Sequence, residues 1–525
     1  MSVRWAGTRV LAMVVIATAA AAPGQASASG LLDVPFVSQS ARLCGGAAAA
    51  MVLRYWGARG VRAEDFASLV DEEAGGIRQS VLAGALGARG WTVLPLETPD
   101  DEGLARQIAL GRPVVALIED RPGRYHYVVI VGWTGDRVIY HDPALAPFRT
   151  IARDAFDDRW KATGRWAIVP VPCASCVMPG AERVPGARAV PRATAAPDAG
   201  CAGLVAEGVR LARDGDRSGA ARALEASVAL CPGSADAHLE LAGLRFLDRR
   251  WREAEALAAR AAGLAPESAH AWRVLASSRF IEGDNEGALD AWNRADEPRL
   301  DLVRVSGLGR TRHRLVEDVI DVEAGGVLTS ASLARARRRV AELPAASATR
   351  VSYVPAAGGL ADIEVAVVER PFRPSTLTLV ARAARATVER EVVADVSSLT
   401  RSGERLSVAW RFWENRPAVS VRADTPSLFG VTGLWTIEGD WSRQPYALAD
   451  STIVVDERRH AGMRYADWLT DATRVEAGAG LDRWSGRAIS AFVSGALEQR
   501  LVNDRVAARV DGSIWPSNPG AFGAG

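Results

Sequence analysis

The spacing of hydrophobic residues changes several times along the chain, and each change predicts a different architecture. An alanine-rich run after Cys44, ending at Gly57, places apolar residues on one face and predicts a helix. Residues 125–133 are mostly apolar and predict a buried strand, with residues 137–143 as its hairpin partner. After these elements, hydrophobic residues recur at helical spacing, and from about residue 375 onward apolar and polar residues alternate strictly. The pattern therefore predicts a multidomain chain.

A regular repeat governs residues 201–298. The positions that recur at an interval of 34 residues are Ala220, Ala254, Ala288, Pro232 and Pro266. This pattern resembles three tetratricopeptide repeats, which implies an α-helical solenoid whose concave face binds a peptide or another protein. A structural spacer without a ligand is the alternative.

Residues 300–371 combine strand and helix patterns. The predicted order is a strand after Leu302, helices over 311–322 and 330–343, and strands over 350–355 and 362–370. This βααββ order, with Gly325 and Gly358-Gly359 at its turns, resembles a polypeptide-transport-associated (POTRA) domain. The resemblance implies a unit associated with protein transport or assembly.

Strict alternation marks residues 375–525. In residues 405–412 every second side chain is large and apolar, and those between are small or polar. Such runs, with tryptophan near strand ends, are typical of an antiparallel outer-membrane β-barrel, and the place behind a POTRA-like unit favours that interpretation. The region resembles the start of outer-membrane assembly and two-partner secretion transporters, with room for roughly eight or nine strands, so we expect either a small barrel or an incomplete one. A soluble β-sandwich with one solvated face is the alternative.

The N-terminus predicts export. Arg4 and Arg9 precede an apolar run over 11–22, and small residues end at Ala28. A run of about a dozen residues is too short for a membrane span, which needs about 20, and fits a signal peptide over 1–28. We therefore expect a protein of the periplasm, the outer membrane or both, in a Gram-negative bacterium. An uncleaved anchor is the alternative.

Composition narrows the function classes. The 525 residues are 48% hydrophobic and 24% charged, with a net charge of +1. These values exclude a disordered chain, a polybasic nucleic-acid binder and a helical membrane protein as primary interpretations. We expect no cofactor, no metal and no nucleic-acid partner.

Candidate nucleophilic chemistry begins at Cys44. This cysteine lies in the first turn of the predicted helix, where unpaired backbone N–H groups and the helix dipole stabilise a thiolate. Gln39, five residues upstream, carries an amide that can donate a hydrogen bond to a developing oxyanion. A buried, inert cysteine is the alternative interpretation of Cys44 alone.

A histidine and an aspartate lie on the predicted hairpin. His126 and Asp142 can lie side by side on adjacent antiparallel strands, so that the carboxylate holds the imidazole in one tautomer. The other ring nitrogen can then accept the thiol proton. His141 precedes the aspartate and should point to the opposite face of its strand.

The order and spacing of these residues resemble the bacteriocin-processing, or double-glycine, family of papain-like cysteine peptidases. The resemblance covers residues 31–172. Besides the residues above, it rests on Pro35-Phe36, the Cys44-Gly45 helix start, Tyr55-Trp56-Gly57 and Asp142-Pro143.

The resemblance implies an α+β papain-like fold with a catalytic triad. By this likeness Cys44 is the nucleophile, His126 the general base, Asp142 the orienting residue and Gln39 the oxyanion-hole donor. The chain departs from the family in two places: Gly46 stands where proline is common, and the spacing from glutamine to cysteine is one residue shorter.

The other cysteines suggest disulfides in an oxidising compartment. Cys173 and Cys176 open a Pro- and Ala-rich linker over 173–200 and could form a local bridge. Cys201 and Cys231 lie at the start and end of the first predicted helical hairpin, whose ends meet, and could form a second bridge.

The sequence thus predicts an exported cysteine peptidase that hydrolyses peptide bonds, with a repeat module for a peptide or protein partner and a tail at the outer membrane. One alternative is a non-catalytic outer-membrane secretion or assembly protein whose peptidase-like domain only recognises peptide. Another is an acyl transferase that uses the same Cys44, His126 and Asp142 set.

Overall fold

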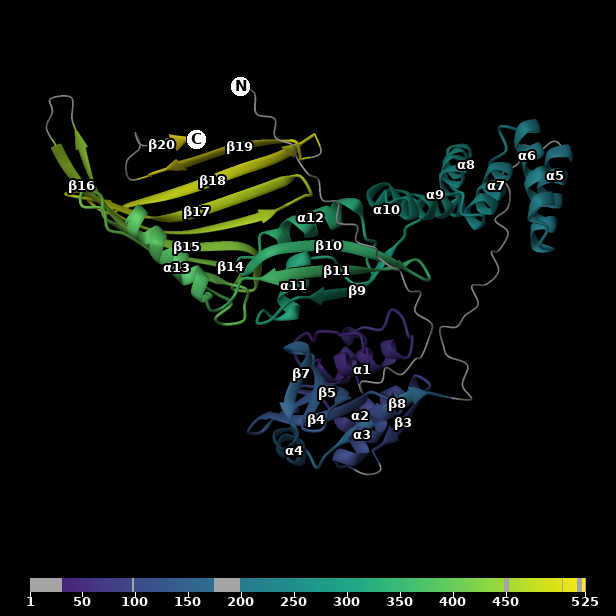
Figure 1. Cartoon of the computed structure of the whole chain (residues 1–525), viewed down its shortest axis with the longest axis horizontal. Helices are drawn as coiled ribbons and strands as arrows, with labels where there is room; N and C mark the ends of the chain where they lie inside the picture. Colours follow the sequence, from purple (N-terminus) through teal and green to yellow (C-terminus); the bar gives the residue numbers. More distant parts are fainter. Residues whose placement is uncertain are drawn as a thin grey trace, which may run out of the picture.

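Four units follow one another along the chain in the computed structural model (Figure 1). The structure describes residues 31–96, 99–173, 199–447, 453–502, 504–516 and 522–524. The predicted signal peptide, Cys176 and most of the predicted linker lie outside these residues. No helix in the described part of the chain is long and apolar enough to cross a membrane.

The first unit is an α/β domain built on a six-stranded antiparallel sheet. Its strand order is β3-β8-β4-β5-β6-β7. The strands are β3 (Trp91–Pro95), β4 (Val114–Arg121), β5 (Arg124–Trp133), β6 (Arg137–Asp142), β7 (Ala146–Ala152) and β8 (Ala167–Pro172). The other elements are α1 (Cys44–Tyr55), the 3₁₀ helix η1 (Ala63–Leu69), β1 (Val70–Asp71), β2 (Gly76–Ile77), α2 (Gln79–Ala88), α3 (Asp101–Ala109) and α4 (Arg153–Lys161).

Helix α1 is the centre of this domain. Every residue from Gly45 to Arg54 is buried, because small alanine side chains let the helix pack closely against η1 and β5. The helix ends where Gly57 adopts a positive φ of 94°. A buried helix whose first residue remains half-exposed is a rigid support for the side chain at its start.

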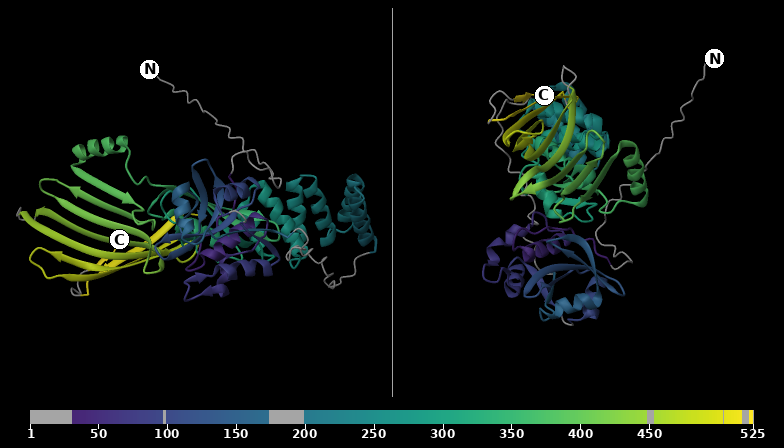
Figure 2. Two further views of the ribbon diagram at one scale, coloured as in Figure 1. Left: turned by 90° about the horizontal axis from the view of Figure 1, so that it is seen from below. Right: turned by 90° about the vertical axis from the view of Figure 1, so that its left-hand side faces the viewer.

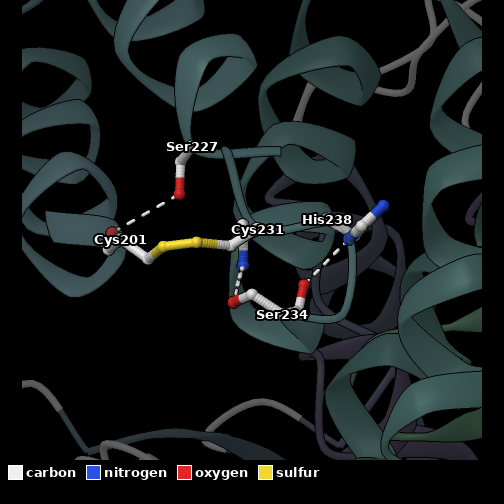
Figure 3. The surroundings of a disulfide bond; sticks show 6 residues. Cys201, Ser227, Cys231, Ser234 and His238 are labelled. Carbon is white, nitrogen blue, oxygen red and sulfur yellow. Dashed lines mark hydrogen bonds between the residues drawn. A yellow bond between two sulfur atoms is a disulfide. The ribbon is translucent and has the colours of Figure 1, made fainter. Parts of the chain in front are cut away.

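Three antiparallel helix pairs form the second unit. They are α5 (Ala199–Arg213) with α6 (Arg217–Leu230), α7 (Ala235–Leu247) with α8 (Trp251–Leu264), and α9 (Ala269–Glu282) with α10 (Asn285–Asn293). Ala220, Ala254 and Ala288, which recur in the sequence, are all fully buried at helix contacts. A disulfide joins Cys201 to Cys231 and so ties the start of α5 to the end of α6 (Figure 3).

The third unit has the βααββ order expected from the sequence. It consists of β9 (Arg299–Ser306), α11 (His313–Ile320), α12 (Ser330–Ala341), β10 (Ala346–Ala356) and β11 (Leu360–Glu369). In the sheet β10-β11-β9, β11 runs antiparallel to β10 and parallel to β9. Trp292 of the last repeat packs on Tyr353 of β10, so one core spans both units. We call residues 299–371 the βααββ unit.

The fourth unit is a large antiparallel sheet preceded by an exposed helix. Helix α13 (Thr376–Glu389), capped by Ser375, was not expected, since alternation was predicted from 375 onward. The strands are β12 (Glu391–Ser397), β13 (Arg405–Arg411), β14 (Ala418–Leu428), β15 (Val431–Ala447), β16 (Ile453–Trp468), β17 (Thr473–Trp484), β18 (Ser490–Leu501), β19 (Val506–Ile514) and β20 (Phe522–Ala524).

The predicted barrel is not closed in the part of the chain that the structure describes. The nine strands pair in sequence order, and the two end strands, β12 and β20, do not pair with each other. The sheet curves into an open shell, visible in Figure 2. The curvature follows from the regular twist of paired strands, but closure requires hydrogen bonding between the two edges.

Candidate active site

Cys44 is the first residue of α1 and a free thiol. Its sulfur accepts hydrogen bonds from the backbone N–H groups of Gly45 and Tyr127 and also contacts the His126 ring. These donors come from the helix start and from β5, which cross at this point. They provide an electropositive environment for the sulfur.

His126 lies between Cys44 and Asp142. Its Nε2 is 2.9 Å from Asp142 Oδ1, and the ring also hydrogen-bonds the Cys44 thiol, which leaves Nδ1 for the sulfur. The strand register explains the arrangement. Val129 of β5 pairs with His141 of β6, so His126 and Asp142 share one face on neighbouring strands.

Asp142 is fixed by further contacts. Arg149 Nη1 donates to its Oδ2 at 2.7 Å, and the backbone N–H of Ala144 donates to its Oδ1 at 3.0 Å. Burial opposes ionisation, but His126, Arg149 and this N–H together hold the pKa of the carboxyl below its usual value. Arg149 was not predicted, because a single basic residue on the strand after β6 carries no pattern of its own.

The pKa values of the three side chains are shifted in the directions that favour a thiolate. Burial alone would raise the pKa of Cys44, but the His126 ring and the two backbone donors outweigh it and lower that pKa. Burial likewise opposes protonation of His126, yet Asp142 and the Cys44 thiolate raise its pKa to about 10. The lowered pKa of the thiol and the raised pKa of the imidazole both favour the thiolate–imidazolium form of the pair.

Gln39 lies beside the Asp142 turn. Its backbone N–H donates to the carbonyl of Pro143 at 3.0 Å. The side-chain Oε1 is buried and has no hydrogen-bond partner among the described residues. The structure thus brings the Gln39 segment to the turn that carries Asp142.

His141 has a different role from His126, as the strand alternation predicted. It is fully buried, its Nε2 donates to the carbonyl of Val34 at 2.8 Å, and its Nδ1 accepts from the backbone N–H of Phe148 at 3.0 Å. Burial lowers its pKa to about 4. His141 is a neutral structural residue and does not face the thiol.

Gly46 explains one departure from the family pattern. A Cβ at this position would lie 2.5 Å from the carbonyl oxygen of Ala63 and 3.0 Å from Phe66 Cβ. Any side chain, including the ring of proline, would therefore force α1 away from η1. The glycine follows from the close packing behind the nucleophile.

The remaining cysteines are engaged elsewhere. Cys201 and Cys231 form the disulfide in the repeat unit, about which Ser227 and Ser234 make the contacts shown in Figure 3. Cys173 is also disulfide-bonded, while Cys176 lies outside the described residues. Among the described cysteines, Cys44 is the free thiol.

Comparisons with known proteins bear mainly on the α/β domain. Residues 31–168 match the model of the Peptidase_C39 like family. No curated protein shows significant similarity to the chain. A structure described as a C39-like peptidase from Bacillus anthracis shares 20% identity with the chain. That match covers 27% of this chain and 98% of the other, with a TM-score of 0.24. The first unit is thus a peptidase-like domain.

Two solved structures resemble other units weakly. The second tetratricopeptide-repeat domain of Spaghetti, bound to an HSP90 peptide, shares 15% identity over 18% of this chain and 90% of its own, with a TM-score of 0.18. BamA from Haemophilus ducreyi lacking POTRA domains 1–3 shares 10% identity over 43% of this chain, with a TM-score of 0.28. The chain covers 50% of that BamA structure.

Proposed function

We propose that the peptidase-like domain is an active cysteine peptidase. The observation that carries the proposal is the continuous contact from Cys44 through His126 to Asp142, with the thiol pKa lowered and the imidazole pKa raised. A domain that only bound peptide would not need a thiolate held beside an imidazolium. The family match supports a peptide substrate.

The geometry supports acyl transfer to the thiol. The Cys44 thiolate attacks the carbonyl carbon of a peptide bond, and the His126 imidazolium gives its proton to the leaving amine as the C–N bond breaks. His126 then removes a proton from water, which attacks the thioester and releases the acid. Asp142 and Arg149 hold the ring throughout, and the Gln39 amide stabilises the oxyanion.

The other units suggest where this peptidase acts. The groove between the repeat helices has a volume of about 460 Å³ and is lined by apolar side chains with Glu240, His270 and Arg273. We assign it a peptide or protein partner. The large antiparallel sheet, whose strands alternate apolar and polar side chains, and the disulfide Cys201–Cys231 fit an exported protein at the outer membrane of a Gram-negative bacterium.

Labelling of Cys44 tests the proposal most directly. The full chain is treated at neutral pH with a thiol-reactive peptide electrophile, and the modified cysteine is identified by mass mapping. We expect fast labelling at Cys44 and a loss of about 10²–10⁴-fold in His126→Ala, because general acid–base assistance has that size. Tyr125→Ala is the matched control: this exposed neighbour of His126 points to the other face of β5, and its loss should change nothing.

A labelling rate in the native protein equal to that of the denatured chain would contradict the proposal. The chain would then be a secretion or assembly protein with an inert peptidase fold. An added labelled amine separates hydrolysis from acyl transfer, because a transferase attaches the amine to the product whereas a peptidase releases a free acid.

A further inference from the structure

Three segments of the peptidase-like domain contact the βααββ unit, and each carries or adjoins a proposed catalytic group. They are the segment 36–39, helix α1 and the turn 142–145. We propose that the β9–α11 face of the βααββ unit is a positioning surface for the active site, and that Glu317 and His313 are its positioning residues. The inference rests on the proposed peptidase function.

The first contact fixes the Gln39 segment. Ser38 is buried, and its hydroxyl donates to Glu317 Oε2 on α11. Phe36 packs edge-on against the ring of His313, with centroids 5.0 Å apart. The amide of Gln39 must be placed within hydrogen-bond distance of an oxyanion. The Gln39 backbone is held by Pro143 of its own domain, whereas the side chain of the residue before it is held by the neighbouring unit.

The second contact reaches the turn that carries Asp142. The ring of His313 is buried beside the backbone of Leu145 in this turn and of Val305 in β9, and its Nδ1 has no hydrogen-bond partner among the described residues. The Leu145 backbone N–H donates in turn to the carbonyl of Asp142 at 2.9 Å. The His313 ring thus lies between β9 and the loop that carries Asp142.

The third contact fixes the far end of the helix that begins at Cys44. Arg54 Nη2 donates to Asp301 Oδ1 at 2.8 Å, and the two side chains are only 3% and 0% exposed. The backbone N–H of Gly60 donates to the same carboxylate at 2.9 Å. This buried ion pair stabilises the contact only while the two units stay in place, because moving them apart would leave a buried charge without a partner.

Figure 1 shows the consequence for the whole unit: the peptidase-like domain lies under β9 and α11, with α1 on the side that faces them. A cavity of about 740 Å³ remains between these parts and is lined by Ser38, Arg54, Asp301 and Glu317 among others. The contact is therefore made at a few points. Removing one of them should loosen the segment that it holds without unfolding the domain.

The test uses the full chain with Glu317→Ala. We expect kcat for peptide hydrolysis to fall by about tenfold to a hundredfold, somewhat less than the ~10²–10³ lost when an oxyanion donor is removed outright. KM should stay within about twofold. Alkylation of Cys44 by iodoacetamide should keep its rate and its pH dependence, since the thiolate pair is not touched.

Matched variants make the result specific. Asp318→Ala removes the next carboxylate on α11, which forms an ion pair with Arg314 of the same helix, and should leave kcat unchanged. Glu317→Gln keeps an oxygen that accepts from Ser38 and should restore most of kcat. Ser38→Ala combined with Glu317→Ala should cost no more than either alone, because both remove one contact.

Hydrogen exchange separates this inference from the peptidase proposal. In Glu317→Ala, backbone exchange of residues 36–40 should rise about tenfold or more above that of Asp318→Ala. Unchanged exchange overturns the positioning role, whatever the hydrolysis assay shows. A native chain that labels slowly and hydrolyses nothing overturns the peptidase proposal, and the exchange result still decides whether α11 holds the segment.

Discussion

Two histidines in one hairpin show how far neighbours set the chemistry of a residue. His126 lies between a thiolate and a carboxylate, which raise its pKa to about 10 against the effect of burial. His141 has the carbonyl of Val34 on one nitrogen and the N–H of Phe148 on the other. Because Nδ1 must accept a hydrogen bond there, protonation breaks a contact, and burial lowers the pKa to about 4.

His141 predicts a loss of stability in mild acid. The unfolded chain binds a proton at its usual pKa near 6.5, whereas the folded domain does so only near 4. The free energy of unfolding that neutral His141 contributes is therefore fully present above about pH 6.5. It is lost as the pH drops to 4, by about 3 kcal/mol for this shift in pKa. The raised pKa of His126 does not change the stability between pH 4 and 6.5. The stabilisation from protonated His126 is fully present below its unfolded pKa and is lost only as the pH rises above it.

The measurement is hydrogen exchange of the β5–β6 hairpin between pH 4 and 7. Exchange is converted to an opening free energy at each pH and compared with His141→Asn, which retains an acceptor and a donor but no titratable group. A flatter pH dependence in the variant is the expected outcome. If both chains show the same slope, another group causes the acid sensitivity.

Much of the site follows from sequence because its residues are short-range features. A cysteine at a helix start and a histidine and aspartate on one hairpin are placed by local periodicity alone. Arg149 and Tyr127 were missed because a basic residue on a third strand and a backbone N–H carry no pattern of their own. Contacts with α11, about 280 residues away in sequence, depend on tertiary packing.

At the scale of elements, the close approach of α1 to η1 determines which residues the helix can contain. Gly46 has the carbonyl of Ala63 at 2.5 Å from the place of a Cβ, whereas Gly84 of α2 is exposed with nothing within 4 Å. The two glycines thus differ in packing although both lie in helices.

The same substitution should have opposite effects at these glycines. Gly46→Ala should destabilise the domain by about 1–3 kcal/mol through overpacking, and should slow labelling of Cys44 as α1 shifts. Gly84→Ala should be neutral or stabilise by up to about 1 kcal/mol, because alanine favours the helix. Thermal unfolding and thiol labelling of both variants provide the check. Equal stability of the two would mean that α1 is not clamped against η1.

The sequence predicted the types of most elements, but it did not predict helix α13 or whether the C-terminal sheet closes into a barrel. The βααββ order follows from hydrophobic periods that switch between 3.6 and 2. Helix α13 was missed although its sequence is amphipathic, and it buries no residue against the rest of the described chain. The open sheet could not be foreseen, since alternation within strands says which side chains share a face and nothing about whether the two edges meet.

At the scale of the molecule, the repeats and the βααββ unit share one core, and the peptidase-like domain is docked to that body by buried polar contacts. The large sheet joins it through ion pairs, with Arg339 bound to Asp467 and Glu342 to Arg474. These contacts hold the peptidase-like domain at a fixed place relative to the repeats and the sheet.

The sheet itself has one apolar and one charged face. An outward ladder runs from strand to strand through Leu406, Ala423, Ile437, Met463, Ala479, Val493 and Ile514. Val408 is 45% exposed and Trp410 54% exposed on this side. The opposite face holds ion pairs such as Arg464 with Glu438 and Arg509 with Glu476. Such a division is expected where lipid covers one face and water the other.

Binding to lipid vesicles tests this arrangement with a matched pair of variants. We expect the native chain to float with phospholipid vesicles in a density gradient. Val408→Arg places a charge on the apolar face and should weaken the bound state by up to about 2–4 kcal/mol, whereas Ser407→Arg, one residue away on the charged face, should have little effect. If the native chain does not float, or if the two variants behave alike, the sheet does not contact lipid through this face. The apolar ladder must then be covered by protein, as in a β-sandwich with one solvated face.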